Sequence, residues 1–156
     1  MPVAAASEAD VEGLRRVALL PPIVGAAQQA RPHGWSGIAL EGYDPVSYFL
    51  DAGPRPGAAA HEVVWNGVAW RFSSAANRAA FVSRPEAYAP RLGGFDALAM
   101  AQGRLVEAAS RFAAIVDKRL YLFSSREARD AFLDNPQAVL QAEAVWRNER
   151  TRLERL

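Results

Sequence analysis

The sequence predicts an α+β fold made of two β-hairpin–helix units, with additional helices at the N- and C-termini. Three observations support this prediction. The stretch from Phe72 to Ala87 recurs from Phe123 to Ala138, with eight identities in sixteen aligned positions. A pair of turn-forming residues precedes each copy, and a pair of serines stands at the start of each predicted helix. A unit that recurs at a fixed spacing is one supersecondary element that buries its apolar face against its copy.

The first unit spans residues 61–90. Strands are predicted over Glu62–Trp65 and Val68–Phe72, because Asn66-Gly67 between them suits a type I′ turn with positive φ at both central residues. Ser73 or Ser74 then caps a helix that ends at Arg84-Pro85.

The second unit spans residues 114–138. Its strands are predicted over Ala114–Val116 and Leu120–Phe123, around the turn Asp117-Lys118. A helix over Ser125–Leu133 ends at Asn135-Pro136. Repetition of the serine pair, Ser73-Ser74 and Ser124-Ser125, favours capping over catalysis in both copies.

Additional elements flank the two units. We expect residues 1–34 to form an N-terminal helix over Glu8–Leu20 and a linker, and residues 35–156 to form the duplicated domain, with a short entry strand over Trp35–Leu40. A last helix from Pro136 to about Leu156 carries an apolar stripe and a charged end. That end is either a solvated face or an interaction helix.

Two shorter helices are predicted from capping patterns. Asp44 can cap a helix that begins at Pro45, and Gly53-Pro54 ends it. The second, Asp96–Gln102, follows the sharp bend expected at Gly93-Gly94.

Composition excludes several classes of function. The chain has 156 residues, 51% of them hydrophobic, and a net charge of +1. This near-neutral balance provides no field that would attract phosphates, so nucleic acid is not an expected partner. The chain has no cysteine, which excludes disulfides, thiolate metal sites and cysteine nucleophiles. A cysteine-free protein is compatible with cytoplasm or periplasm, and we favour the cytoplasm.

One segment has some features of a targeting or membrane-surface sequence. Residues 14–30 contain two arginines, a short apolar run and small residues. Acidic residues precede the arginines, Pro21-Pro22 interrupts the run, and the run is too short to span a bilayer. We therefore favour an N-terminal helix that the prolines end, and no transmembrane segment.

From about Ala39 to Trp146, the order and spacing of several motifs resemble a known family. The motifs are GYDPVSYF, WRFSSAANRAAF, RPEAYAP and LGGFDALAMAQG. They resemble the longer bacterial form of the YHS domain, a relative of the small treble-clef-like modules of heavy-metal handling proteins. The resemblance implies a treble-clef-like scaffold for this chain.

The chain departs from that family where the family carries cysteines. The resemblance implies that metal-binding members carry cysteine ligands at the positions that Ser47, Ser73 and Asn77 occupy here. The same positions in the second copy are Ser124 and Ala128. A further cysteine expected after the double glycine is replaced by Asp96. A soft-metal site needs three or four thiolate or imidazole ligands, so we expect no metal and no cofactor.

Candidate chemistry is sparse. A metal site built from His33 and His61, or from aspartates, is not favoured, and no serine has an evident histidine and carboxylate beside it. If a small-ligand pocket exists, we place it at Tyr43, Asp44, Tyr48 and Asp96, although core packing of the tyrosines is the favoured interpretation.

We therefore expect the chain to be a non-catalytic YHS-like accessory domain that binds a protein partner through its terminal helices. The alternative is a small-ligand or metal binder that uses non-thiol ligands near Tyr43, Tyr48 and Asp96. A hydrolase or isomerase is the least favoured class.

Overall fold

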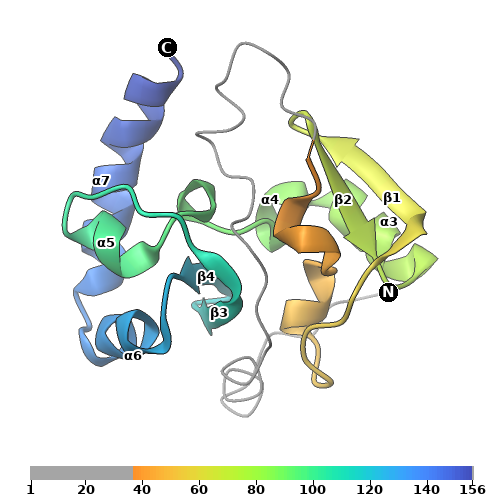
Figure 1. Ribbon diagram of the computed structural model, residues 1–156, viewed down its shortest axis with the longest axis horizontal. Coiled ribbons are helices and arrows are strands. Elements are labelled where there is room, and N and C mark those ends of the chain that lie inside the picture. The colour runs from red at the N-terminus through yellow and green to blue at the C-terminus, as the bar shows by residue number, and fades with distance from the viewer. Residues whose placement is uncertain (1–36, 156) are drawn as a thin grey trace.

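The computed structural model describes residues 37–155 and confirms a mixed α+β fold (Figure 1). The predicted N-terminal helix, its linker and His33 lie outside the described residues. Within the described range there are two two-stranded antiparallel sheets, five α-helices and three 3₁₀ helices. In chain order the elements are η1 (Ala39–Gly42), η2 (Val46–Phe49), β1 (Ala58–Trp65), β2 (Val68–Phe72), α3 (Ala75–Ser83), α4 (Pro85–Tyr88), η3 (Leu92–Gly94), α5 (Ala97–Ala101), β3 (Ala109–Val116), β4 (Arg119–Phe123), α6 (Arg126–Asp134) and α7 (Ala138–Leu153).

The two hairpins have the same register. In the first, Trp65 pairs with Val68, and pairing continues to Glu62 with Arg71 before the register shifts and resumes at Ala58 with Phe72. In the second, the corresponding pairs run from Val116 with Arg119 to Ala113 with Leu122, and resume at Ala109 with Phe123. The irregularity breaks the alternation of side chains. Strand prediction relies on this alternation, so it missed the first residues of β1 and β3.

The turns and helix starts agree with the capping chemistry in the sequence. Asn66 and Gly67 have φ of 51° and 75°, as a type I′ turn requires. The hydroxyls of Ser74 and Ser125 accept hydrogen bonds from the backbone N–H groups of Asn77 and Ala128, respectively. The second serine of each pair is therefore the helix cap.

Three elements differ from the predictions. The helix expected after Asp44 is the single 3₁₀ turn η2, and it ends at Phe49. The last helix is shorter than expected at both ends, since α7 covers Ala138–Leu153. At the predicted entry strand, Ile38 forms an isolated parallel bridge with Ala69, and Ala39 already belongs to η1.

A left-handed bend precedes each hairpin. Leu40, Glu41 and Gly42 have φ of 54°, 49° and 91°, and Leu92, Gly93 and Gly94 have φ of 60°, 63° and 81°. Leucine and glutamate rarely adopt this conformation, so surrounding contacts must hold it. In each half the bend leads to a residue that bridges the segment ahead of the first strand, Tyr43 to Pro56 and Phe95 to Glu107.

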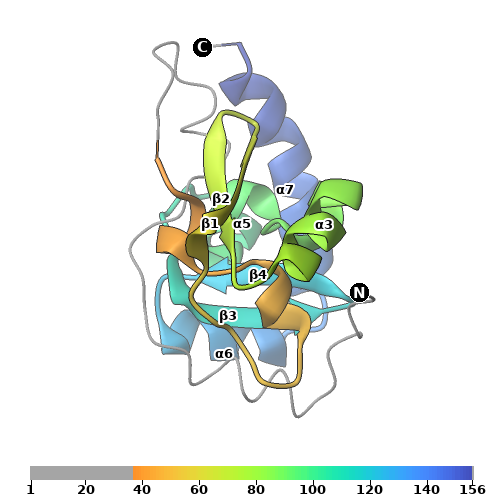
Figure 2. The same cartoon turned by 90° about the vertical axis from the view of Figure 1, so that its right-hand side faces the viewer.

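The hairpin β3–β4 lies between two apolar cores (Figures 1 and 2). Its side chains alternate between the two faces of the hairpin. Leu120 and Leu122 pack with the first half of the chain, while Tyr121 and Phe123 pack with α6 and α7. The first core contains chiefly Leu40, Val46, Tyr48, Phe49, Val68, Trp70, Phe72, Phe81, Ala113, Ile115, Leu120 and Leu122.

The second core contains chiefly Leu92, Met100, Ala114, Tyr121, Phe123, Phe132, Ala138, Ala142 and Trp146. Each core has a helix phenylalanine among other rings. Phe81 packs against Trp65, Trp70 and Phe72, and Phe132 packs against Tyr121 and Phe123. Among residues 37–155, no helix has the length and apolar character needed to cross a membrane.

Gly57 allows the segment before β1 to pass close to β2. A Cβ added at Gly57 would lie 2.5 Å from the carbonyl carbon of Arg71. The backbone N–H of Gly57 also donates to the carbonyl oxygen of Gly42 at 2.7 Å. Both neighbours are backbone atoms, which cannot move without distorting the hairpin or the bend.

We predict that Gly57→Ala lowers the free energy of unfolding by about 3 kcal/mol, because the methyl group forces the strands apart. The matched control is Gly53→Ala, where a Cβ meets nothing within 4 Å and only the positive φ of 75° opposes the change. The control should lose about 1 kcal/mol. Urea denaturation measures both, and equal losses would contradict the close approach at Gly57.

Candidate functional site

Asp44 is the centre of a buried polar cluster in the first half. Its carboxylate is fully buried. Oδ1 accepts hydrogen bonds from the backbone N–H groups of Val46 at 2.8 Å and Ser47 at 3.3 Å. Oδ2 accepts from the backbone N–H and the hydroxyl of Ser73, both at 2.8 Å, and from Nδ2 of Asn77 at 2.7 Å. One carboxylate thus caps η2 and ties it to the start of α3.

Ser47 extends this cluster toward the loop before β1. Its hydroxyl donates to the carbonyl oxygen of Asp44 at 2.6 Å and accepts from the backbone N–H of Arg55 at 2.8 Å. Ser47 is fully buried, and Asn77 is 5% exposed. Each buried polar group in the cluster has a partner, as stable burial requires.

Asp96 has the corresponding position in the second half. Its Oδ1 accepts from the backbone N–H of Ala99 at 3.0 Å and caps α5. Its Oδ2 accepts from the backbone N–H of Ser124 at 2.7 Å and from the hydroxyl of the same serine. Asp96 is 2% exposed. It makes three hydrogen bonds where Asp44 makes five, in part because Ala128 replaces the amide that Asn77 supplies to Asp44.

The four residues proposed from the sequence for a ligand site fall into two groups. Tyr43 is half-buried against the first core, and Tyr48 is fully buried, with its hydroxyl donating to the carbonyl oxygen of Ser110 at 3.0 Å. Burial, followed by the neighbouring Tyr43, raises the pKa of Tyr48, so its hydroxyl stays protonated. Asp44 and these tyrosines belong to the first half, whereas Asp96 makes its hydrogen bonds in the second.

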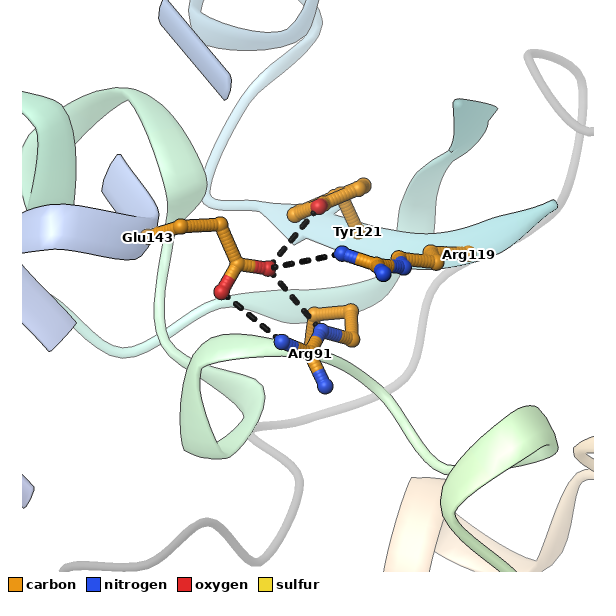
Figure 3. Close-up of polar contacts among 4 residues, drawn as sticks. All are labelled: Arg91, Arg119, Tyr121 and Glu143. Atoms are coloured by element: carbon orange, nitrogen blue, oxygen red, sulfur yellow. Dashed lines mark hydrogen bonds and ion pairs between the residues drawn. The ribbon is translucent and has the colours of Figure 1, made fainter. Parts of the chain in front are cut away.

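A third polar cluster, which was not among the sites predicted from the sequence, surrounds Glu143 on α7 (Figure 3). Arg91 donates to both carboxylate oxygens, from Nε to Oε1 at 2.9 Å and from Nη2 to Oε2 at 2.8 Å. The hydroxyl of Tyr121 donates to Oε1 at 3.0 Å. Nη1 of Arg119 lies 3.9 Å from Oε1, beyond hydrogen-bond distance. The cluster therefore joins α7 to β4 and to the chain before η3.

The charges of this cluster shift its pKa values. Burial raises the pKa of Glu143, but the hydrogen bonds and charge of Arg91 outweigh burial, so the net pKa is lowered. Burial, then the charge of Glu143, raises the pKa of Tyr121 to about 12. At neutral pH the cluster thus holds two arginine cations, one carboxylate and a neutral tyrosine.

One feature of the sequence could have indicated this cluster. Glu143 lies between Ala142 and Trp146, which both face the second core. A charged residue beside the apolar stripe of a helix requires a partner of opposite charge. The partners are distant in sequence, and the pattern of α7 alone does not identify them.

The remaining candidates for metal binding and catalysis are the acidic side chains and the paired serines. Among residues 37–155, no group of three or more His, Asp or Glu side chains could hold a metal ion. The hydroxyls of Ser73 and Ser124 donate to Asp44 and Asp96, respectively. The arrangement of the two aspartates is that of structural caps. No protein-family model, curated protein or solved structure matches the chain.

We predict that Asp44→Ala lowers the free energy of unfolding by about 3 to 5 kcal/mol, because it leaves five donated hydrogen bonds without an acceptor. Asp96→Ala is the matched variant and should lose about 2 to 3 kcal/mol, since three hydrogen bonds are lost. Chemical denaturation at neutral pH measures both. A smaller loss for Asp44→Ala than for Asp96→Ala would contradict this ranking.

The Glu143 cluster predicts a pH-dependent contribution to stability. Because the folded pKa of Glu143 lies below its ordinary value of 4.5, the contribution is complete above that value and is lost as pH falls through the folded pKa. Glu143→Gln should lower the free energy of unfolding at pH 7 by about 1 to 3 kcal/mol. The difference from wild type should vanish in acid.

The control for this experiment is Glu149→Gln on the same helix. Glu149 pairs with Arg152 at 2.6 Å, but both residues belong to α7 and Arg152 is 64% exposed. An exposed pair of this kind contributes at most about 1 kcal/mol. A difference between Glu143→Gln and wild type that persisted at low pH would show that charge is not its cause.

Proposed function

We propose that the chain is a non-catalytic accessory domain with a cysteine-free, YHS-like scaffold that binds a protein partner. The observation that carries the proposal is the use of the buried carboxylates. Asp44 and Asp96 are 0% and 2% exposed, respectively. The carboxylate oxygens of both accept hydrogen bonds that hold distant backbone segments together. A general acid or base must reach its substrate, and neither carboxylate does.

The proposed family likeness is supported by the surroundings of Asp44. The likeness implies that Ser47, Ser73 and Asn77 stand where metal-binding members of the family carry cysteine ligands. Ser47 lies far from Ser73 and Asn77 in the sequence, and all three make hydrogen bonds to Asp44. We propose that a hydrogen-bonded carboxylate takes the structural place that a metal holds in metal-binding relatives, within a treble-clef-like hairpin–helix unit.

We also propose that the two hairpin–helix units arose by internal duplication. The common register of the hairpins, the left-handed bends before them and the paired caps Ser74 and Ser125 support this proposal. Asp44 and Asp96 have equivalent places in the two units. Eight shared residues in the sixteen aligned positions add independent support from the sequence.

The partner surface that we propose is the outer face of α7. Ala138, Ala142 and Trp146 bury the inner face of this helix, whereas Leu140 is 68% exposed on its outer face. In the described part of α7, Leu140 is the one large apolar side chain with such exposure. This apolar surface is small, so the contact must combine it with polar groups. The N-terminal residues also proposed for partner binding lie outside the described range.

The small-ligand alternative near Tyr43, Tyr48 and Asp96 gains no support from an observation in the structure. Tyr48 and Asp44 are fully buried, and Asp96 is nearly so. A ligand at these groups would require the core to open, at the cost of the hydrogen bonds described above.

Affinity purification of the full chain from its native host, with metal analysis of the eluate, tests the proposal. We expect a protein partner to co-purify in a stoichiometric amount with wild type and with Val82→Ser, and to be lost with Leu140→Ser. Val82 is the matched control because it is 55% exposed on α3. An equal loss in both variants would refute the α7 surface. A stoichiometric transition metal bound to the purified chain would refute the metal-free domain.

A further inference from the structure

The cluster around Glu143 carries more positive than negative charge. Arg91 and Arg119 converge on a single carboxylate, and the Tyr121 hydroxyl is neutral because its pKa is raised to about 12. The two arginines and the one carboxylate thus give the cluster a net charge of +1. The adjoining turn adds no net charge, because the exposed Asp117 and Lys118 on it cancel.

The carboxylate of Glu143 already accepts three hydrogen bonds. Oε1 accepts from Arg91 and Tyr121, and Oε2 accepts from Arg91. Arg119 therefore interacts with Glu143 by charge alone, with its nearest nitrogen 3.9 Å from Oε1. Glu143 therefore does not use all of the hydrogen-bond donors of the two guanidinium groups.

The unused donors are accessible. A guanidinium group has five N–H donors. Arg91 gives two nitrogens to Glu143, and its third nitrogen points away from the carboxylate in Figure 3. The side chains of Arg91 and Arg119 are 33% and 55% exposed, respectively. Tyr121 interacts with both arginines, but one hydroxyl cannot occupy all of the donors that Glu143 leaves unused. Two neighbouring guanidinium groups with such donors can bind one further anionic group in fork geometry.

We propose that Arg91 and Arg119 bind a carboxylate group on an acidic segment of the protein partner, an inference that rests on the proposed function. A carboxylate is the group that Arg91 already binds through two parallel hydrogen bonds at this place. A second carboxylate neutralises the surplus charge. The site lies beside α7, the helix that we propose as the partner surface, so one partner can contact both.

Fluorescence anisotropy with a labelled oligoglutamate peptide at low salt tests the inference on the full chain. Arg119→Gln should weaken peptide binding about three- to tenfold, the expected range for one charged contact at a partly exposed site. Its fold should stay intact, because an exposed ion pair at 3.9 Å contributes little to stability. Circular dichroism and thermal unfolding verify this.

The chain offers a closely matched control in Arg150→Gln. Arg150 is 57% exposed and lies 3.9 Å from Glu154, nearly the exposure and distance of Arg119. Arg119 differs from it in sharing the carboxylate of Glu143 with a second arginine, Arg91. We expect peptide affinity to be unchanged in Arg150→Gln. An equal loss in both variants would mean that the peptide senses net charge only, and would refute the site.

A variant with the opposite expected effect strengthens the test. Glu143→Gln removes the internal carboxylate and leaves Arg91 and Arg119 without an opposing charge, so peptide affinity should rise. Unchanged or weaker binding by a folded Glu143→Gln protein would count against the inference. A labelled oligothymidylate of equal length distinguishes the ligand class, and tighter binding of that polymer than of oligoglutamate would overturn the assignment to a carboxylate.

Failure of this inference and failure of the proposed function give different results. If a partner co-purifies and depends on Leu140, but oligoglutamate binding does not depend on Arg119, the accessory function stands and the carboxylate site is wrong. If oligoglutamate binding depends on Arg119 while no partner is recovered, the site exists and the accessory function is wrong.

Discussion

The structure depends on a buried carboxylate that joins segments from different parts of the sequence. Asp44 accepts hydrogen bonds from its own 3₁₀ turn and from the junction of β2 and α3, and Asp96 does the same for α5 and the junction of β4 and α6. A hydrophobic core alone does not fix the register between such segments, because apolar contacts are not directional. The carboxylates supply direction, since each oxygen must meet specific N–H and O–H groups.

The two hairpins have similar backbones but differ in how much of their surface is buried. The outer face of β1–β2 carries Glu62 and Arg71, which form an ion pair at 2.9 Å. At the equivalent places in β3–β4 the chain has Ala113 and Leu122, which are fully buried. β2 accordingly alternates between buried and half-buried residues, whereas β4 is buried at every position after Arg119. Burial on both faces requires continuous apolar residues, and the sequence of β4 provides them.

Local chemistry made much of the fold predictable. The turn at Asn66-Gly67, the serine caps and the cap at Asp44 depend on neighbours within four residues, and the structure contains them all. The irregular starts of β1 and β3 were not predictable, because unpaired residues break the period-two pattern on which strand prediction relies. The short η2 was also overestimated, because a good cap favours a helix start but does not determine helix length.

The candidate site was less predictable than the fold. The grouping of Tyr43, Asp44 and Tyr48 follows from their closeness in sequence, but their complete or partial burial does not. The second hydrogen-bonding role of Asp44, as acceptor from Ser73 and Asn77, joins residues about thirty positions apart. The Glu143 cluster joins four residues from three segments, and its long-range partners leave no periodic trace in any one segment.

The position of β3–β4 between the two cores has a consequence for how the molecule comes apart. One face of this hairpin closes the first core, and the other face closes the second. Each apolar core would be exposed to water if the hairpin left, so we expect the described region to unfold as one cooperative unit rather than in two steps. A break in the chain between the halves would produce two fragments that have to find each other before either becomes ordered.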